Sequence, residues 1–86
     1  MKMFDVQFTS QPEKFLKKAE KQLAIRIVER IEKLRGEPFP SDVKRVVNKK
    51  EKIFRIRLGD YRIQYSVFYD KNLIIVTDID KRPRAY

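Results

Sequence analysis

The strongest constraint on how this chain can fold is a pair of alternating segments that flank Gly59-Asp60. Residues 53–58 and 61–69 alternate apolar with polar side chains, which is the period of a β-strand whose two faces differ in environment. Glycine at the first position of a two-residue loop favours a tight hairpin turn. The turn also predicts a register, with the pairs Leu58–Tyr61, Arg57–Arg62 and Ile56–Ile63.

The predicted hairpin has one apolar and one polar face, because paired residues lie on the same side of a sheet. The apolar face consists of Phe54, Ile56, Leu58, Tyr61, Ile63, Tyr65 and Val67. The polar face consists of Arg55, Arg57, Arg62, Gln64 and Ser66. We therefore expect the apolar face to be covered by the core and the polar face to stay open unless something binds it.

A last strand is predicted over residues 73–79, after a turn at residues 70–72. With a three-residue loop, the side chains on the core face are Leu73, Ile75 and Ile79. The same loop puts Asp80 and Arg82 on the polar face, with Asp80 near Arg62. A two-residue loop would reverse this arrangement, so both registers are compatible with the sequence.

The first half of the chain predicts a strand that leads directly into a helix. Residues 3–9 alternate as a half-buried strand. Ser10 is then a candidate N-cap, with Pro12 in the first turn and Glu13 at the capping-box position.

A second helical pattern resumes at Leu23 and continues to Leu34, with a break near residues 20–22, although one bent helix would also fit. Gly36 is a natural C-cap, and residues 43–47 form a short strand. Together the elements predict one α+β domain over residues 1–86. It has an N-terminal strand, a two-helix hairpin, and an antiparallel β-sheet with the helices on one face.

Composition excludes several classes of protein. The chain contains no Cys and no His, so disulfides, the commonest metal ligands and the usual general base at neutral pH are absent. No apolar run approaches the roughly 20 residues of a membrane span, and the N-terminus shows no apolar core of a signal peptide. We therefore expect a cytoplasmic protein that uses Arg, Lys, Tyr or carboxylates and needs no metal or cofactor.

Positive charge is concentrated in the second half of the chain. Residues 44–86 contribute +7 of the net charge of +9. A field of this sign raises the local concentration of polyanions. Charge alone is also compatible with a well-solvated surface, so it indicates nucleic acid only together with a defined site.

The predicted pair of Arg57 and Arg62 supplies such a site. Like charges directly opposite each other destabilise a hairpin, and a broken local rule often marks function. The guanidinium fork matches phosphate oxygens in a bidentate manner. The alternative is an exposed face that Asp78 or Asp80 neutralises.

Two segments then resemble a known family. The run Ile53-Phe54-Arg55-Ile56-Arg57-Leu58-Gly59-Asp60-Tyr61-Arg62-Ile63-Gln64-Tyr65 is similar to the signature hairpin of the RelE/ParE toxin superfamily. The ending Asp80-Lys81-Arg82-Pro83-Arg84-Ala85-Tyr86 resembles the final motif of its RelE-type members. The resemblance covers nearly the whole chain, and the terminal motif favours RelE-type ribonucleases over ParE-type gyrase inhibitors.

The resemblance implies a RelE-like, microbial-ribonuclease-like fold and a ribosome-dependent mRNA endonuclease, the toxin of a type II toxin–antitoxin pair. The reaction that the resemblance implies is cleavage of codons in the ribosomal A site by metal-independent attack of the RNA 2′-hydroxyl on phosphate. The implied catalytic residues are Arg55, Arg57, Arg62, Arg82 and Tyr86. The residues expected to bind RNA around them are Lys44, Arg45, Lys49, Lys50, Lys52, Lys81 and Arg84.

One departure from the family concerns the general base. Some members have Lys where this chain has Arg55 and Arg57, and Arg does not lose its proton in proteins. A non-catalytic nucleic-acid-binding relative therefore stays an alternative, beside a ParE-like gyrase inhibitor. The expected partners are a cognate RelB-type antitoxin, the ribosome with its mRNA, and operator DNA bound through the antitoxin complex.

Overall fold

The computed structural model describes residues 3–46 and 52–81, and within them neither helix is long and apolar enough to cross a membrane. The elements are β1 (Asp5–Phe8), α1 (Ser10–Lys18), α2 (Lys21–Leu34), β2 (Lys44–Arg45), β3 (Phe54–Leu58), β4 (Tyr61–Phe68), the short 3-10 helix η1 (Tyr69–Lys71) and β5 (Leu73–Lys81). The predicted fold class is confirmed.

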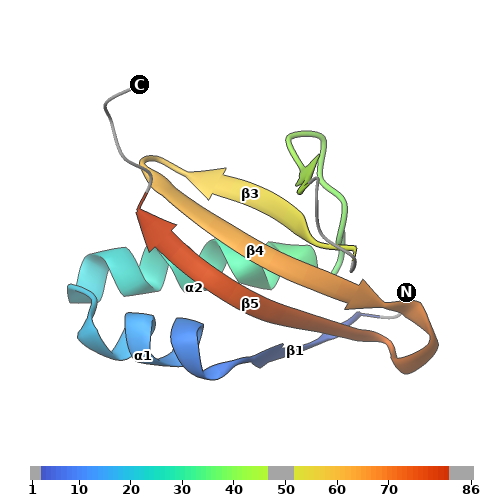
Figure 1. The fold of residues 1–86 in the computed structure, drawn as a ribbon, viewed down its shortest axis with the longest axis horizontal. Helices are drawn as coiled ribbons and strands as arrows, with labels where there is room; N and C mark the ends of the chain where they lie inside the picture. The colour runs from blue at the N-terminus through green and yellow to red at the C-terminus, as the bar shows by residue number, and fades with distance from the viewer. Residues whose placement is uncertain (1–2, 47–51, 82–86) are drawn as a thin grey trace.

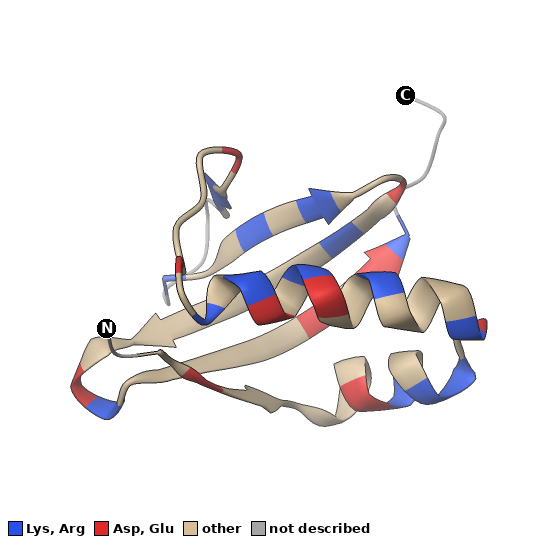
Figure 2. Ribbon diagram, turned by 180° about the vertical axis from the view of Figure 1, so that it is seen from behind, with Lys and Arg blue, Asp and Glu red and all other residues tan. Residues whose placement is uncertain are grey.

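The five strands form one mixed sheet in the order β1-β5-β4-β3-β2. β1 pairs with β5 in parallel at one edge, and the other neighbours are antiparallel. Figure 1 shows the sheet in front of α2, with α1 below it near β1, and Figure 2 shows the helices from the other side. One sheet face is therefore covered by the helices, as the sequence predicts.

The central hairpin has the predicted register. Leu58 pairs with Tyr61, Arg57 with Arg62, and Ile56 with Ile63. Gly59 in the turn has a φ of 59°, a left-handed conformation that glycine adopts without a steric penalty.

The core lies between this sheet and α2. Its fully buried side chains come from α2 (Ile27, Ile31, Leu34) and from β3, β4 and β5 (Ile56, Ile63, Tyr65, Ile74, Val76, Ile79). Phe15, Leu16 and Leu23 from the two helices pack against this cluster while remaining partly exposed. The apolar side chains of the alternating hairpin thus form the sheet side of the core.

The predicted register of β5 is wrong over its first half. Ile74 and Val76 are buried there, and Leu73 and Ile75 are only partly buried. Phe68 pairs with Leu73, so the loop has four residues, and its last residue, Asn72, has a left-handed φ of 53°. Asn tolerates that conformation through its short polar side chain.

A β-bulge then restores the predicted face for the second half of β5. Gln64 pairs with Asp78, but Tyr65 pairs with Val76, so Thr77 is an extra residue in the ladder. The extra residue returns Ile79 to the core, as predicted, and leaves Asp80 on the opposite face.

The predicted N-cap of the first helix is wrong by one residue. Thr9 is the N-cap and Ser10 is the first helical residue, with no side-chain capping bond. The Thr9 hydroxyl instead donates to the carbonyl of Thr77 on β5, at 3.1 Å. The Thr9 hydroxyl therefore bonds to β5 instead of capping the helix.

The predicted break between the two helices is confirmed. Glu20 is the N-cap of α2, and its carboxylate accepts a hydrogen bond from the backbone N–H of Gln22 at 3.0 Å. At the far end Arg35, rather than Gly36, is the C-cap. β2 is shorter than the predicted strand 43–47, whose last residue lies outside the described residues.

Tyr65 connects the core to the loop after α2. Its side chain is 0% exposed, and its hydroxyl donates to the Pro38 carbonyl. Burial raises the pKa of the Tyr65 hydroxyl well above its ordinary value; Arg30 lowers this pKa and Asp42 raises it. The hydroxyl is therefore a neutral hydrogen-bond donor in the folded protein.

We expect Tyr65→Phe to lower the free energy of unfolding near neutral pH by about 1 kcal/mol, because one buried hydrogen bond is lost. Above about pH 10 the unfolded chain releases this proton while the folded chain keeps it, so the stability that Tyr65 contributes falls as pH rises. Urea unfolding of both proteins at about pH 8 and pH 11 measures the effect. The difference between them should shrink at the higher pH, and a constant difference would contradict the prediction.

Candidate functional site on the open sheet face

Basic side chains gather on the sheet face opposite the helices, near the hairpin turn. Arg55, Arg57 and Arg62 alternate with buried residues of β3 and β4, so they point away from the core. Lys44 pairs with Arg55 and lies on the same face. We call these four side chains the arginine face, and Figure 2 shows the basic positions of β3 and β4 toward the turn.

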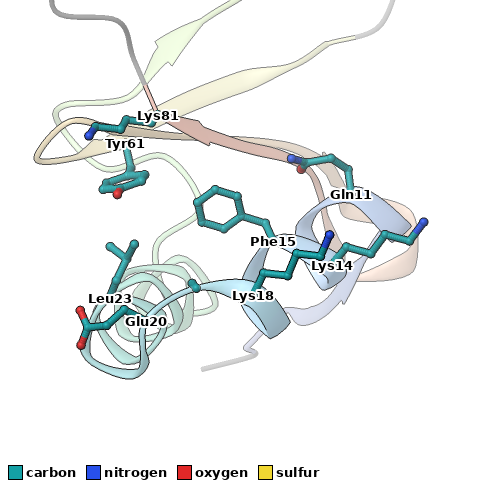
Figure 3. A pocket seen from close by; sticks show the side chains of 9 residues that line it. Gln11, Lys14, Phe15, Lys18, Glu20, Leu23, Tyr61 and Lys81 are labelled. Atoms are coloured by element: carbon teal, nitrogen blue, oxygen red, sulfur yellow. The ribbon is translucent and has the colours of Figure 1, made fainter.

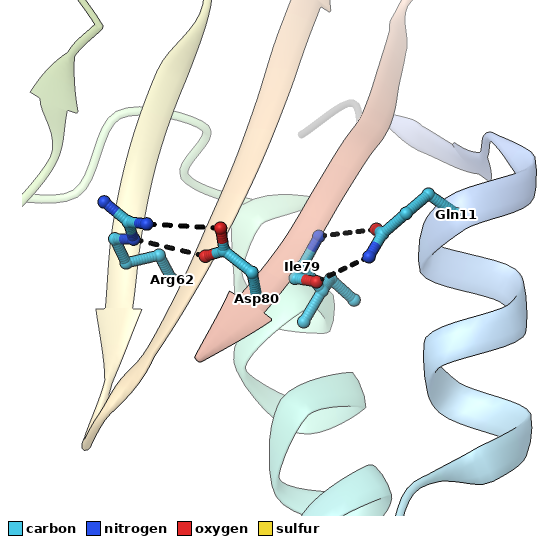
Figure 4. A network of polar contacts seen from close by, with 4 residues as sticks. All are labelled: Gln11, Arg62, Ile79 and Asp80. Carbon is cyan, nitrogen blue, oxygen red and sulfur yellow. Dashed lines mark hydrogen bonds and ion pairs between the residues drawn. The ribbon is translucent and has the colours of Figure 1, made fainter. Parts of the chain in front are cut away.

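Arg62 is held by a carboxylate on the neighbouring strand. Its Nε and Nη2 donate to the two oxygens of Asp80 at 3.1 and 3.2 Å (Figure 4). The side chains are 23% and 41% exposed, so the pair lies at the surface and is screened by solvent. The predicted proximity of Asp80 to Arg62 is confirmed. This geometry offsets the repulsion between Arg57 and Arg62 and fixes the plane of one guanidinium.

The remaining members of the arginine face line a small hollow. Arg55, Arg57 and Lys44 surround it together with Asp42, and its volume is about 220 Å³. Asp42 is itself held by Arg30, whose Nη2 donates to both carboxylate oxygens at 2.9 and 2.7 Å. Three cations thus converge on a space that contains one carboxylate already paired with another residue. A phosphate group is the kind of ligand that such donors bind.

The arginine face does not extend along the whole sheet. Ser66 was predicted to be exposed on the open face, but it is only 7% exposed. Ile53 is also buried, at 6% exposed, although Phe54 beside it is the residue that packs against the core. The prediction of an open polar face is therefore wrong at Ser66. The basic site is confined to the hairpin end.

The structure separates the other predicted RNA-binding residues. Arg45 pairs with Phe54 and so lies on the helix side of the sheet. Lys52 lines a hollow of about 450 Å³ with Ser66, Val67 and Phe68. These residues were expected around one site, but strand alternation directs Arg45 to the other face, and Lys52 lies at the end of β4 away from the hairpin turn. Five predicted site residues, Lys49, Lys50, Arg82, Arg84 and Tyr86, lie outside the described residues.

Lys81 belongs to a larger apolar pocket that the sequence reasoning missed. The pocket has a volume of about 560 Å³ and lies between α1, the start of α2, the start of β4 and the end of β5 (Figure 3). Its lining residues are Gln11, Lys14, Phe15, Lys18, Ala19, Glu20, Leu23, Tyr61 and Lys81. Phe15 and Leu23 have the spacing of core residues, so the sequence carries no signal that they also form a wall open to solvent. Within the described ranges, no group of three or more carboxylates is placed to hold a metal ion.

The fold and the site define a class: a small α+β protein with a cationic sheet face opposite its helices. Residues 6–86 match the family model described as the ParE toxin of the type II toxin–antitoxin system parDE. The chain therefore belongs to the RelE/ParE superfamily of type II toxins, as its hairpin motif predicts.

Individual relatives agree with this assignment. The putative toxin RelE1 of Methanocaldococcus jannaschii is 39% identical over 61 residues, which is 67% of each chain. The archaeal RelE–RelB complex from Pyrococcus horikoshii OT3 has a chain with a TM-score of 0.82 and 31% identity, covering 96% of this chain and 99% of that one. A chain of the RelBE2 toxin–antitoxin complex from Mycobacterium tuberculosis has the same fold, with a TM-score of 0.83, 24% identity, and coverage of 95% and 94%. This protein is thus a RelE-like toxin.

Proposed function

We propose that this toxin is a ribosome-dependent mRNA endonuclease that cleaves codons in the ribosomal A site. The observation that carries the proposal is the pairing of Arg62 with Asp80, which holds one guanidinium in a fixed plane beside Arg57. A cation oriented before the substrate arrives stabilises developing charge without reorganising during the reaction. The ribosome would present the codon, and we place the protein in the cytoplasm for this reason.

The proposed reaction needs no metal or cofactor. The RNA 2′-oxygen forms a bond to the adjacent phosphorus, and the bond from phosphorus to the 5′-oxygen breaks. The 2′-hydroxyl loses its proton to a base, and the leaving 5′-oxygen takes up a proton. Charge builds on the phosphoryl oxygens and on the leaving oxygen, which are the atoms that cations must stabilise.

Each residue of the site has a proposed role. Arg62 contacts the scissile phosphate, and Arg57 and Arg55 hold it or help to activate the 2′-hydroxyl. Arg82 stabilises the leaving oxygen, and Tyr86 stacks on the target nucleotide. Because Arg keeps its proton, neither Arg55 nor Arg57 acts as the general base. The base is Tyr86 or a group of the ribosome, or the rate rests on positioning and electrostatics.

The proposed protein partner is a RelB-type antitoxin, because the neighbouring structures from Pyrococcus horikoshii and Mycobacterium tuberculosis are toxin–antitoxin complexes. The apolar pocket suits an amphipathic partner, since Lys14, Lys18 and Lys81 surround the walls formed by Phe15 and Leu23. An acidic, mostly helical segment would complement that rim. The complex would bind its operator DNA through the antitoxin.

Primer extension on a defined messenger in a purified translating ribosome tests the proposal, with wild type beside Arg82→Ala. A single cut within the A-site codon, lost in the variant, is the expected result. Folded wild-type protein that leaves the messenger intact would overturn the ribonuclease assignment.

The match to a ParE family model favours a second candidate, inhibition of DNA gyrase. In that case Arg82→Ala and Tyr86→Ala leave gyrase binding largely intact, and wild type inhibits supercoiling without cutting RNA. A supercoiling assay run beside primer extension separates the two functions.

Asp80→Asn should strengthen binding of single-stranded RNA by roughly three- to tenfold at about 0.1 M salt, because it removes a negative charge beside Arg62 of the arginine face. Fluorescence anisotropy with a labelled oligonucleotide measures the change. Asp5→Asn is the matched control, since Asp5 is exposed near the opposite end of β5. An equal gain from both variants would show that net charge, rather than the arginine face, sets the affinity.

A further inference from the structure

The second half of β5 is supported at its outer edge by side chains instead of a strand. Pairing with β1 ends at Phe8 and Val76, where the chain turns into α1. Thr9 continues the edge, with its backbone N–H donating to the Val76 carbonyl and its hydroxyl to the Thr77 carbonyl, both at 3.1 Å. The bulge at Thr77 lies at this point. Bulges bend a strand, so the support from β1 does not carry past it.

Gln11 supplies the support beyond the bulge. Its side-chain amide donates from Nε2 to the Ile79 carbonyl at 2.8 Å, and its Oε1 accepts from the Ile79 N–H at 2.9 Å. Figure 4 shows the two bonds running from α1 to β5. A carboxamide presents the same donor and acceptor as a peptide group. Gln11 therefore replaces one residue of the missing neighbour strand and fixes both the position and the tilt of Ile79.

The geometry links this attachment to the arginine face. The N–H and C=O of one strand residue point to the same side, so those of Ile79 point away from β4, and those of Asp80 point toward it. Asp80 follows Ile79 directly and receives two hydrogen bonds from Arg62. A shift of Ile79 would move the carboxylate that sets the plane of the Arg62 guanidinium.

We propose that Gln11 is a positioning residue for the toxin's reaction. Its hydrogen bonds hold Ile79 in place, Ile79 in turn fixes the position of Asp80, and Asp80 orients the Arg62 guanidinium. The inference rests on the proposed function of the arginine face. Gln11 acts through β5 and touches neither Arg62 nor the substrate. Its effect is therefore on the rate of the chemical step more than on RNA binding.

Amide exchange tests the structural link without any activity. In Gln11→Ala we expect the Ile79 amide to exchange roughly tenfold faster, the size expected for the loss of one or two net hydrogen bonds. The Arg62 Nε–H should also exchange faster. Gln11→Glu keeps the acceptor but sets a carboxylate against the Ile79 carbonyl, so it should behave like Gln11→Ala. Gln22→Ala is the matched control, because Gln22 is an exposed glutamine on the other helix, α2. Unchanged exchange at both sites in Gln11→Ala would overturn the inference.

Cleavage kinetics on the ribosome test the positioning role. Gln11→Ala should lower kcat by about fivefold or more with less than about a twofold change in KM. Repeating it in an Asp80→Asn background decides the route, because a residue acting through Asp80 then has no further effect. An equal loss of kcat in both backgrounds would overturn the proposed route.

Failure of the proposed function has a different signature. Wild type that does not cut RNA contradicts the ribonuclease assignment. The exchange of Ile79 and Arg62 then decides alone whether Gln11 aims the arginine. Wild type that cuts RNA, with Gln11→Ala equally active, contradicts the positioning role and leaves the ribonuclease assignment standing.

Discussion

Arg62→Ala is expected to lower the rate of cleavage of ribosome-bound mRNA by about 10²–10³-fold, the usual cost of removing one preorganised donor at a developing charge. Within the arginine face, Arg62 is the residue whose guanidinium plane is fixed by Asp80. Its loss also leaves the Asp80 carboxylate beside the substrate phosphate, where it repels the same charge. Single-turnover primer extension on saturated ribosomes measures the effect on the chemical step.

Arg45→Ala is the matched control for this experiment. It removes the same charge, but Arg45 lies on the helix side of the sheet. We expect a change in rate of less than about threefold, because only long-range attraction is lost. Equal effects of the two variants would mean that overall charge carries the activity, and the assignment of Arg62 would then be wrong.

Ile63→Ala is expected to have the largest effect on stability. It should lower the free energy of unfolding by about 2–5 kcal/mol, which is a large share of the whole unfolding free energy of a domain of this size. Ile63 is 0% exposed at the centre of the sheet, where β4 has neighbours on both sides. Truncation removes apolar contacts and leaves a cavity that the surrounding strands fill only in part. The melting temperature should fall by roughly 10 °C or more.

Val28→Ala provides the comparison for this loss of stability. Val28 lies on α2 and is 39% exposed, so truncation removes less buried surface, while alanine is the better helix former. We expect a change within about 1 kcal/mol of wild type. Calorimetry on both variants checks the prediction. A similar loss in both would contradict the view that the sheet centre carries most of the stability.

The hairpin was predictable because its loop leaves little freedom. Two residues with glycine first, Gly59-Asp60, allow one register, and the alternating pattern then assigns every side chain to a face. The loop before β5 contains no such constraint. Its four residues include the left-handed Asn72, and the bulge at Thr77 changes the alternation again. Neither feature can be read from the alternation of apolar residues, so the predicted face was wrong at Leu73 and Ile75.

The arginine face could be predicted for the same reason, since Arg55, Arg57 and Arg62 are assigned by alternation within the hairpin. Arg45, Lys52 and Lys81 were grouped with them by charge, which carries no information about the side of the sheet. No sequence pattern indicated a role for Gln11. A single glutamine in the first turn of a helix has no pattern, and its role depends on where β1 stops.

The parallel edge formed by β1 and β5 also has a consequence for the order in which the protein can be completed. Thr9 bonds to Thr77 across 68 residues of sequence, so this contact cannot form until Thr77 has been synthesised. A nascent chain that has released only its first four strands displays Arg55, Arg57 and Arg62 without Asp80 and without a partner for β1. The pairing of Arg62 with Asp80 therefore forms only after the last strand has left the exit tunnel. Under the proposed function, a ribosome that is still translating this chain does not yet face a cleavage site with an oriented Arg62.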